Sequence, residues 1–397
     1  MITYYPRLIM DRFRDAVRDK RILLLRGPRQ SGKTTLMKML LSEVGGTYID
    51  FTQETWAERF SRDPLSFSNL RQPLFLDEIS YVRNAGRALK TFYDEHHTKM
   101  IVSGSGAFDV KQEITGHLVG RVSTLTLYPL NFDEFVWWKD PSLYEWYSGI
   151  KERIWGYLLR REDTFPELPE IPKLEEYYKE YTKFGGYPDI VLNTDKEDRL
   201  KDLIETQLEK DLFRLFDIRD KLKFRDLMKQ LAYNIGNLLN IHNLNINYKT
   251  SWRYLSIMNA EYILELISPY HKNLSTELRK TPKLYFYDLG VANLLAEYRL
   301  GIGEINENFV FIQLHTRFGV EKLRYWRTLS GAEIDFVIVN KNEPALPIEV
   351  KTSKHRSRAL WGFLERYGLK RGVIISDHVD LRRRGSLEVI HLPIWWV

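Results

Sequence analysis

The chain contains no cysteine, although it is 397 residues long. Disulfide bonds, thiolate nucleophiles and zinc sites built from cysteine are therefore excluded. The chain also lacks any apolar run close to the roughly 20 residues that a membrane-spanning helix needs. No apolar stretch of the signal-peptide type follows Met1. We therefore expect a cytoplasmic protein without a membrane partner.

The overall composition is that of a globular protein with several domains. The chain is 44% hydrophobic and 28% charged, and its length predicts two to four domains, each able to bury a core. Its formal net charge is +6. This mild excess of basic residues permits a nucleic-acid partner and does not require one.

A glycine-rich stretch near the N-terminus carries the clearest chemical signal. An apolar run over residues 22–25 precedes it, and a helical apolar pattern over residues 35–41 follows it. This order of strand, loop and helix matches the phosphate-binding pattern G-x-x-x-x-G-K-[ST], in which glycines let the backbone approach phosphate oxygens. The predicted nucleotide-binding residues are Gly27, Pro28, Arg29, Gln30, Ser31, Gly32, Lys33, Thr34 and Thr35.

Two acids on a second buried strand fit the same chemistry. Lys33 is expected to reach the β- and γ-phosphates, and the Thr34 hydroxyl to ligate Mg²⁺. The apolar run over residues 74–79 contains Asp77 and Glu78. In a P-loop fold the first acid stands beside the Mg²⁺, and Glu78 is suited to polarise the attacking water. ATP and Mg²⁺ are thus the predicted cofactors, with GTP left open because no base-reading motif is visible.

Three further polar residues are candidates for the γ-phosphate region. Residues 100–106 are predicted as a short buried strand that ends near Ser103 and Ser105. In P-loop ATPases with an additional strand, a polar residue of that strand faces the γ-phosphate; an ordinary Gly/Ser turn is the alternative. Arg121 is a candidate γ-phosphate sensor or an arginine finger given to a neighbouring copy, which would require a homo-oligomer. A plain surface arginine is the other interpretation.

Together with residues 127–130, Leu-Tyr-Pro-Leu, these segments resemble the prokaryotic AAA+-related ATPases of the STAND/MNS group, often called archaeal-type ATPases. The resemblance covers nearly the whole chain. It implies an α/β fold with an AAA+-like P-loop sheet over residues 1–135, a helical lid over 136–215, a winged helix over 216–290 and a PD-(D/E)XK nuclease-like domain over 291–397. Residues 184–188, Phe-Gly-Gly-Tyr-Pro, resemble a lid element near the nucleotide, and a purely structural turn is the alternative.

The last hundred residues hold a second set of candidate metal ligands. Asp335 and Glu349 fall on successive predicted strands, and Lys351 lies two residues after Glu349, on the same side of its strand. With Glu307 from the preceding helix, the carboxylates would bind Mg²⁺ or Mn²⁺, and Lys351 would position the attacking water. The resemblance implies that this is a nuclease-like site. Solvated acids at strand ends are the alternative.

Three helical segments followed by two strands, within residues 216–290, are typical of a winged helix, whose recognition helix would contain Lys249, Thr250, Arg253 and Tyr254. Three functions remain open. The first is a Mg²⁺-dependent ATPase that acts on DNA as a switch or motor. The second is a slow nucleotide-gated switch whose C-terminal half binds a protein partner. The third is a nuclease that the ATPase domain regulates.

Overall fold

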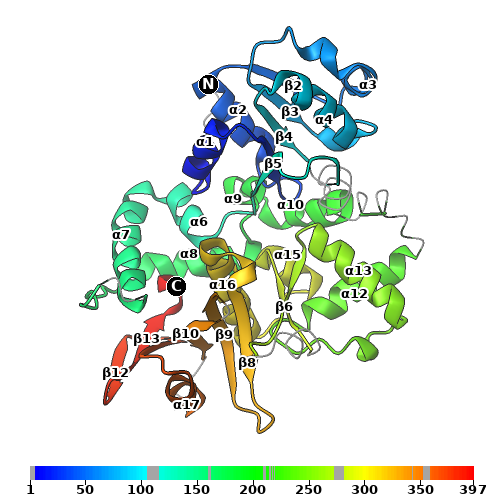
Figure 1. Cartoon of the computed structure of the whole chain (residues 1–397). Helices are drawn as coiled ribbons and strands as arrows, with labels where there is room; N and C mark the ends of the chain where they lie inside the picture. The colour runs from blue at the N-terminus through cyan, green and yellow to red at the C-terminus, as the bar shows by residue number, and fades with distance from the viewer. Residues whose placement is uncertain are drawn as a thin grey trace.

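The computed structural model describes residues 5–104, 116–159, 162–208, 212–213, 216, 218, 220–271, 281–341, 343–351 and 358–397. Figure 1 shows an α/β unit at the N-terminal end, a helical middle part, and a second sheet formed by the C-terminal residues. In the described part of the chain, no helix combines the length and apolar character needed to cross a membrane.

The N-terminal unit is a five-stranded sheet in which every neighbouring pair is parallel. The strand order is β2-β3-β4-β1-β5. The position of the strand over residues 100–103, between the P-loop strand and the strand with Asp77, agrees with the additional-strand arrangement predicted from the sequence. The strands are β1 (Ile22–Arg26), β2 (Thr47–Asp50), β3 (Leu74–Asp77), β4 (Met100–Ser103) and β5 (Val122–Thr126).

Helices cover both faces of this sheet, which explains the continuous apolar runs of its strands. Leu23 and Leu25 pack with α1 and α2 on one face. Ile22 and Leu24 pack with α3 and α4 on the other face. The helices and short 3₁₀ turns are α1 (Met10–Arg18), α2 (Lys33–Val44), α3 (Glu54–Arg62), η1 (Pro64–Phe67), η2 (Ile79–Tyr81) and α4 (Ala85–His96).

The middle part is mostly helical and contains one small antiparallel sheet, β6–β7. Proline opens α7, α8 and α9, where its fixed φ and missing N–H are tolerated. The elements are α6 (Phe132–Lys139), α7 (Pro141–Leu158), α8 (Pro172–Phe184), α9 (Pro188–Leu192), α10 (Lys196–Asp202), the π-helical turn Leu203–Leu208, α12 (Lys221–Ala232), η4 (Ile241–Asn243), α13 (Tyr248–Ala260), β6 (Leu264–Ile267), β7 (Lys283–Phe286) and α15 (Leu289–Leu295).

The Gly-Gly turn after α8 joins the middle part to the end of the first sheet. Gly185 has φ +78°, and a Cβ on Gly186 would lie 2.0 Å from the carbonyl oxygen of Leu130. The Leu130 N–H donates to the Gly186 carbonyl at 2.7 Å. Asp288, at the N-terminus of α15, accepts a hydrogen bond from the Gly186 N–H at 2.7 Å. These contacts require glycine at position 186 and show that residues 184–188 form a tight packing turn.

The C-terminal unit is a mixed six-stranded sheet of order β12-β13-β11-β10-β9-β8. The β12–β13 hairpin was not predicted: the basic run Arg382–Arg384 lies on its outer strand, where Arg382 pairs with Asp380 and Arg383 with Glu388. The elements are α16 (Ile302–Phe318), η5 (Val320–Lys322), β8 (Leu323–Arg327), β9 (Glu333–Asn340), β10 (Glu343–Val350), α17 (Arg358–Tyr367), β11 (Arg371–Ser376), β12 (Asp380–Arg384), β13 (Leu387–Pro393) and η6 (Ile394–Trp396).

One hydrophobic cluster runs from residue 130 to residue 397 and includes side chains from the predicted lid, winged-helix and nuclease-like regions, and a second cluster lies mainly in the C-terminal sheet and α17. The limits between the predicted domains therefore stay predictions, because the first cluster extends across the last three of them. The elements α12, α13, β6 and β7 follow the order expected of a winged helix. Of the predicted recognition-helix residues, Tyr254 is buried, whereas Lys249 and Arg253 are exposed. Arg253 donates to the Phe216 carbonyl at 2.6 Å.

Candidate functional site

The loop between β1 and α2 wraps around the N-terminus of α2. Gly27 has φ +146°, and a Cβ there would lie 2.0 Å from the Leu127 carbonyl oxygen, so only glycine fits. Gly32 has φ +97° and directly precedes the helix. The buried Ser31 hydroxyl donates to the Pro28 carbonyl at 2.9 Å and holds the loop closed. The helix N-terminus and the loop amides thus form a concave anion-binding surface.

The side chain of Lys33 folds back into this loop. Its Nζ donates to the carbonyl oxygens of Gly27 at 2.9 Å and Pro28 at 2.7 Å. Burial lowers the pKa of Lys33 to about 8, while the nearby carboxylates of Glu78 and Asp77 oppose that decrease. The ammonium is therefore held where phosphate oxygens would arrive, and it would exchange loop carbonyls for phosphate as hydrogen-bond partners.

Asp77, at the end of β3, is the centre of a hydrogen-bond network. Its Oδ2 accepts from the Thr34 hydroxyl at 2.7 Å and from the Tyr48 hydroxyl at 2.5 Å. Its Oδ1 accepts a short hydrogen bond from the Ser103 hydroxyl of β4. The hydroxyl and carboxylate oxygens of Thr34 and Asp77 are hard ligands of the kind that Mg²⁺ prefers, so the residues present fit that ion.

Glu78 follows Asp77 in a left-handed conformation, with φ 55° and ψ 50°. Its backbone N–H donates to the Ser103 hydroxyl at 3.1 Å, which fixes the turn at the end of β3. Its carboxylate acts electrostatically on Lys33. Ser103 thus bonds to both residues 77 and 78, beside the Thr34–Asp77 pair, and its predicted role at the γ-phosphate stays a prediction. Ser105 lies outside the described residues.

Arg121 lies at the wrong end of the sheet to contact this chain's own nucleotide. It directly precedes β5, and its carbonyl accepts from the Ile22 N–H at the start of β1. The P-loop follows the other end of β1, about 13 Å further along the strand. Arg121 pairs with Asp94 at 2.8 Å on the surface. The structure therefore does not support a sensor role within one chain, and a finger role in a neighbouring copy stays a prediction.

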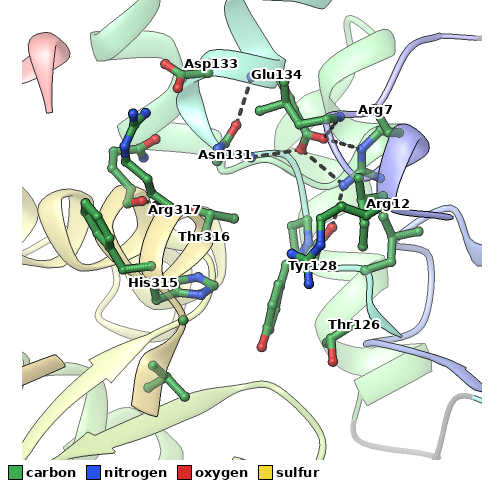
Figure 2. Close-up of a pocket in the computed structure, with 18 of the residues that line it drawn as sticks. Arg7, Arg12, Thr126, Tyr128, Asn131, Asp133, Glu134, His315, Thr316 and Arg317 are labelled. Atoms are coloured by element: carbon green, nitrogen blue, oxygen red, sulfur yellow. Dashed lines mark hydrogen bonds and ion pairs between the residues drawn. The ribbon is translucent and has the colours of Figure 1, made fainter. Parts of the chain in front are cut away.

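The sequence did not indicate a buried arginine, Arg7, that donates a hydrogen bond to the P-loop. Arg7 donates to the Ser31 carbonyl at 2.8 Å and to the Tyr128 carbonyl at 2.7 Å. It also pairs with Glu134 at 2.9 Å, and both side chains are almost fully buried. Figure 2 shows this pair beside the capping residue Asn131 of α6. Arg7 thus joins α1, the P-loop and α6, and no local pattern in the sequence indicates it.

The middle part also reaches the site through the turn after α13. The Glu261 carboxylate raises the pKa of Lys33 electrostatically, against the larger effect of burial. The ring of Tyr262 lies 5.6 Å from the ring of Tyr128. Pro188 of the Gly-Gly turn is also close: its Cγ lies 3.9 Å from where a Cβ of Gly32 would be. The predicted lid element therefore lies beside the P-loop in addition to its structural role.

A cavity of about 670 Å³ lies beside β5, between α1, α7 and α16, and Figure 2 shows its lining. Lys33 and Asp77 are not among its lining residues. His315 of α16 lies at its wall, with its ring 4.6 Å from that of Tyr128 and 5.0 Å from that of Tyr287. Neither ring nitrogen has a hydrogen-bond partner among the described residues. Burial lowers the pKa of His315 to about 3.

This buried histidine predicts a loss of stability in mild acid. Between pH 6.5 and 3 the unfolded chain binds a proton at His315 and the folded chain does not, so the free energy of unfolding falls as the pH falls. At pH 5 the loss is about 2 kcal/mol relative to pH 7.5. Urea unfolding at both pH values should show this loss as the difference between wild type and His315→Leu, because Asp288 and Glu307, whose pKa values burial raises to about 6 and about 7, shift the stability of both chains in the opposite direction. The exposed His117→Leu is the control; a pH dependence that His315→Leu leaves unchanged would contradict the assignment.

The predicted second metal site is a carboxylate cluster at the edge of β9 and β10. Glu307 and Asp335 both contact Lys283 Nζ, at 2.9 and 3.3 Å. Glu349 pairs with Lys351 at 2.8 Å. The structure thus brings together the four residues that the sequence predicted. Among the described residues, however, no group of three or more His, Asp or Glu side chains is placed to hold a metal ion.

Comparisons with known proteins agree with the geometry of the N-terminal unit. Residues 19–136 match a family model described as an AAA domain. Residues 175–303 and 302–395 match two domains of unknown function, DUF8612 and DUF4143. An uncharacterized protein of Methanocaldococcus jannaschii is 26% identical over 351 residues, which are 83% of this chain and 74% of the relative.

Two further similarities are more distant. An uncharacterized protein of Mycobacterium tuberculosis is 25% identical over 350 residues, covering 84% of this chain and 71% of the relative. A Walker-type ATPase of Pyrococcus abyssi has a solved structure with a TM-score of 0.46 and 17% identity, over 74% of this chain and 96% of that one. The match to the AAA family model and the P-loop on a parallel five-stranded sheet thus agree in making the N-terminal unit similar to P-loop ATPase domains of the AAA type.

Proposed function

We propose that the protein is a Mg²⁺-dependent ATPase that acts as a nucleotide-controlled switch on DNA. The observation that supports ATP hydrolysis best is the meeting of Lys33, Thr34, Asp77 and Ser103 at the ends of three neighbouring elements, with Glu78 next to Asp77. This arrangement places the cationic donor Lys33 next to the hydrogen-bonded pair Thr34 and Asp77, with the carboxylate of Glu78 on the following residue.

Each residue has a distinct task in this proposal. Lys33 donates to the β- and γ-phosphate oxygens, and the amides of the loop bind the remaining phosphate oxygens. Thr34 binds Mg²⁺ directly and Asp77 holds it through water. The bound Mg²⁺ neutralises charge that develops on the phosphates. Glu78 accepts a proton from the water that attacks the γ-phosphate.

The switch part of the proposal rests on the contact between the ATPase site and the middle part. Glu261 and Tyr262, which join α13 to β6, lie close enough to influence Lys33 and Tyr128. Nucleotide binding changes the charge at the P-loop, and it would therefore change the electrostatic interactions of the residues at the end of α13. Since P-loop ATPases do work by such differences between nucleotide states, the middle part is the element that would respond.

DNA is the partner that the charge pattern favours. The exposed face of α12 has a row of basic side chains with Asp226 as its acidic member. Basic residues along one helix face are suited to a phosphate backbone. The residues concerned are Lys221, Arg225 and Lys229, which recur every four residues, whereas the exposed Lys223 lies on another side of the helix. This face belongs to α12, whereas the sequence had pointed to the helix now seen as α13.

A protein partner is the second candidate, because the same surface also exposes apolar side chains. Leu222 of α12 is 70% exposed and Tyr248 of α13 is 55% exposed. Large apolar side chains exposed to this degree are candidates for contacts with another protein. In this case the ATPase would turn over slowly and DNA would leave its rate unchanged.

One experiment separates these functions. We expect wild type to hydrolyse ATP in the presence of Mg²⁺, and single-stranded, duplex or branched DNA to raise the rate several-fold. Lys33→Ala should lose at least about 99% of the turnover, since removing one preorganised charge costs about 100-fold or more. Lys38→Ala, an exposed lysine one turn along α2, is the control. Full turnover by Lys33→Ala would refute the ATPase assignment, and turnover unchanged by every DNA would favour the protein partner.

A further inference from the structure

A buried lysine occupies the centre of the carboxylate cluster in the C-terminal unit. The Nζ of Lys283 lies 2.5 Å from Glu333, 2.9 Å from Glu307 and 3.3 Å from Asp335. The side chain of Lys283 is only 2% exposed. An ammonium group has three N–H donors, and here it faces three carboxylates. The lysine is therefore bound in the way that an inorganic cation would be.

The lysine and the acids come from different parts of the chain. Lys283 is the first residue of β7, in the β6–β7 hairpin, whereas Glu307 lies on α16, and Glu333 and Asp335 lie on β9. The hairpin thus inserts a cation into a site built by the C-terminal unit. Tyr285, two residues further along β7 and on the same side, donates its hydroxyl to Glu307 at 2.6 Å. Two side chains of β7, Lys283 and Tyr285, therefore bind the carboxylates of the C-terminal unit.

The second oxygens of Glu333 and Asp335 also face donors of the protein, and Glu333 Oε2 lies 3.4 Å from Arg327. The second carboxylate oxygen of Asp335 accepts from the Val350 N–H at 2.8 Å. Lys351 pairs with Glu349 at 2.8 Å. Burial lowers the pKa of Lys283, but Glu307, Asp335 and Glu333 outweigh it and raise that pKa above its ordinary value. Lys283 is consequently charged at neutral pH.

A divalent metal ion does not fit the cluster in this state. Oxygen ligands of Mg²⁺ or Mn²⁺ lie roughly 2.0–2.2 Å from the ion, so an ion on Glu307 and Asp335 would occupy the space of the Lys283 ammonium. Two cations that close repel each other strongly. This geometry agrees with the finding that the described residues contain no group placed to hold a metal.

We propose that the Lys283 ammonium takes the place of a divalent cation among Glu307, Glu333 and Asp335, and that the docked β6–β7 hairpin thereby closes this cluster to metal ions. The acids then form a cation site that the protein fills with its own side chain. Opening it requires the hairpin to withdraw. This inference concerns the C-terminal unit and does not depend on ATP hydrolysis.

The test is a count of bound Mn²⁺ by electron paramagnetic resonance, on the full chain without nucleotide. Wild type and Asp335→Asn should bind the same small amount, because the cluster is closed in both. Lys283→Met should gain about one Mn²⁺ per chain, with at least tenfold tighter binding than wild type. Lys283→Met combined with Asp335→Asn should lose the gain. Lys229→Met removes an exposed lysine and is the matched control.

Two results would overturn the proposal. One is a Mn²⁺ site in wild type that Asp335→Asn removes, because an open cluster would then coexist with Lys283. The other is a folded Lys283→Met chain, judged by its thermal transition, that gains no Mn²⁺. If Lys283→Met does not fold, the Mn²⁺ binding of wild type and of Asp335→Asn still tests the proposal, since both chains keep Lys283 and a Mn²⁺ site that Asp335→Asn removes would contradict it.

Discussion

Glu78→Gln should hydrolyse ATP about 10²–10⁴-fold more slowly than wild type, which is the usual contribution of a positioned general base. ATP affinity should stay within about threefold, because the amide keeps the size of the side chain and the Thr34–Asp77 pair stays intact. Turnover is measured as phosphate release at saturating ATP, and affinity with a fluorescent ATP analogue.

The exposed Glu58 of α3 provides the control for this substitution. Glu58→Gln makes the same change of charge in the same domain and should leave the rate unchanged. A Glu78→Gln chain that keeps more than about a tenth of the wild-type rate would assign the water-activating role to another group. Loss of ATP binding along with the rate would instead show that Glu78 acts on the shape of the loop.

Arg7→Ala should lower the free energy of unfolding by about 3–5 kcal/mol, the range typical of removing one partner from a buried ion pair. The substitution leaves Glu134 charged in a nearly dry environment and removes donors from the carbonyls of Ser31 and Tyr128. ATP affinity should fall as well, because the Ser31 contact supports the P-loop. Urea unfolding and nucleotide titration measure the two effects.

Arg12 is the control, because it lies on α1, directly after the segment with Arg7, and is exposed. Arg12→Ala should change the free energy of unfolding by less than about 0.5 kcal/mol. Adding Glu134→Leu to the Arg7 substitution should recover part of the loss, since no buried charge remains. An Arg7→Ala loss below about 1 kcal/mol would mean that water reaches Glu134 and replaces the arginine.

The parts of the site that lie on consecutive residues could be predicted from the sequence. Phosphate binding needs neighbouring amides and glycines in one loop, so Gly27 to Thr34 carry a recognisable spacing. The strands with Asp77 and Ser103 were visible as apolar runs because helices cover both faces of the sheet. The five-stranded parallel sheet and the position of β4 within it follow from the same signals.

Contacts between distant single residues could not be predicted. Arg7 lies 127 positions from Glu134, and Lys283 lies 52 positions from Asp335. In the sequence, Arg7 and Lys283 cannot be distinguished from surface residues, because the acids that pair with them are far away along the chain. Lys283 had one weak signal, because it opens a strand whose next residues are all buried. The sequence could have excluded a γ-phosphate sensor role for Arg121 within its own chain. Arg121 precedes β5 and therefore lies at the amino end of a parallel sheet, whereas the P-loop follows the carboxyl end of β1.

The paired strands β6 and β7 connect the turn beside the ATPase site with the carboxylate cluster. Tyr262 lies beside Tyr128 just before β6, and the ladder of this hairpin ends with Ile267 opposite Lys283. Four paired residues span only about 10 Å, and a hydrogen-bonded ladder is stiff along its length. Thermodynamic linkage then acts in both directions. If a nucleotide changes the equilibrium constant for docking of Lys283 in the cluster, displacement of Lys283 changes the affinity for that nucleotide by the same factor.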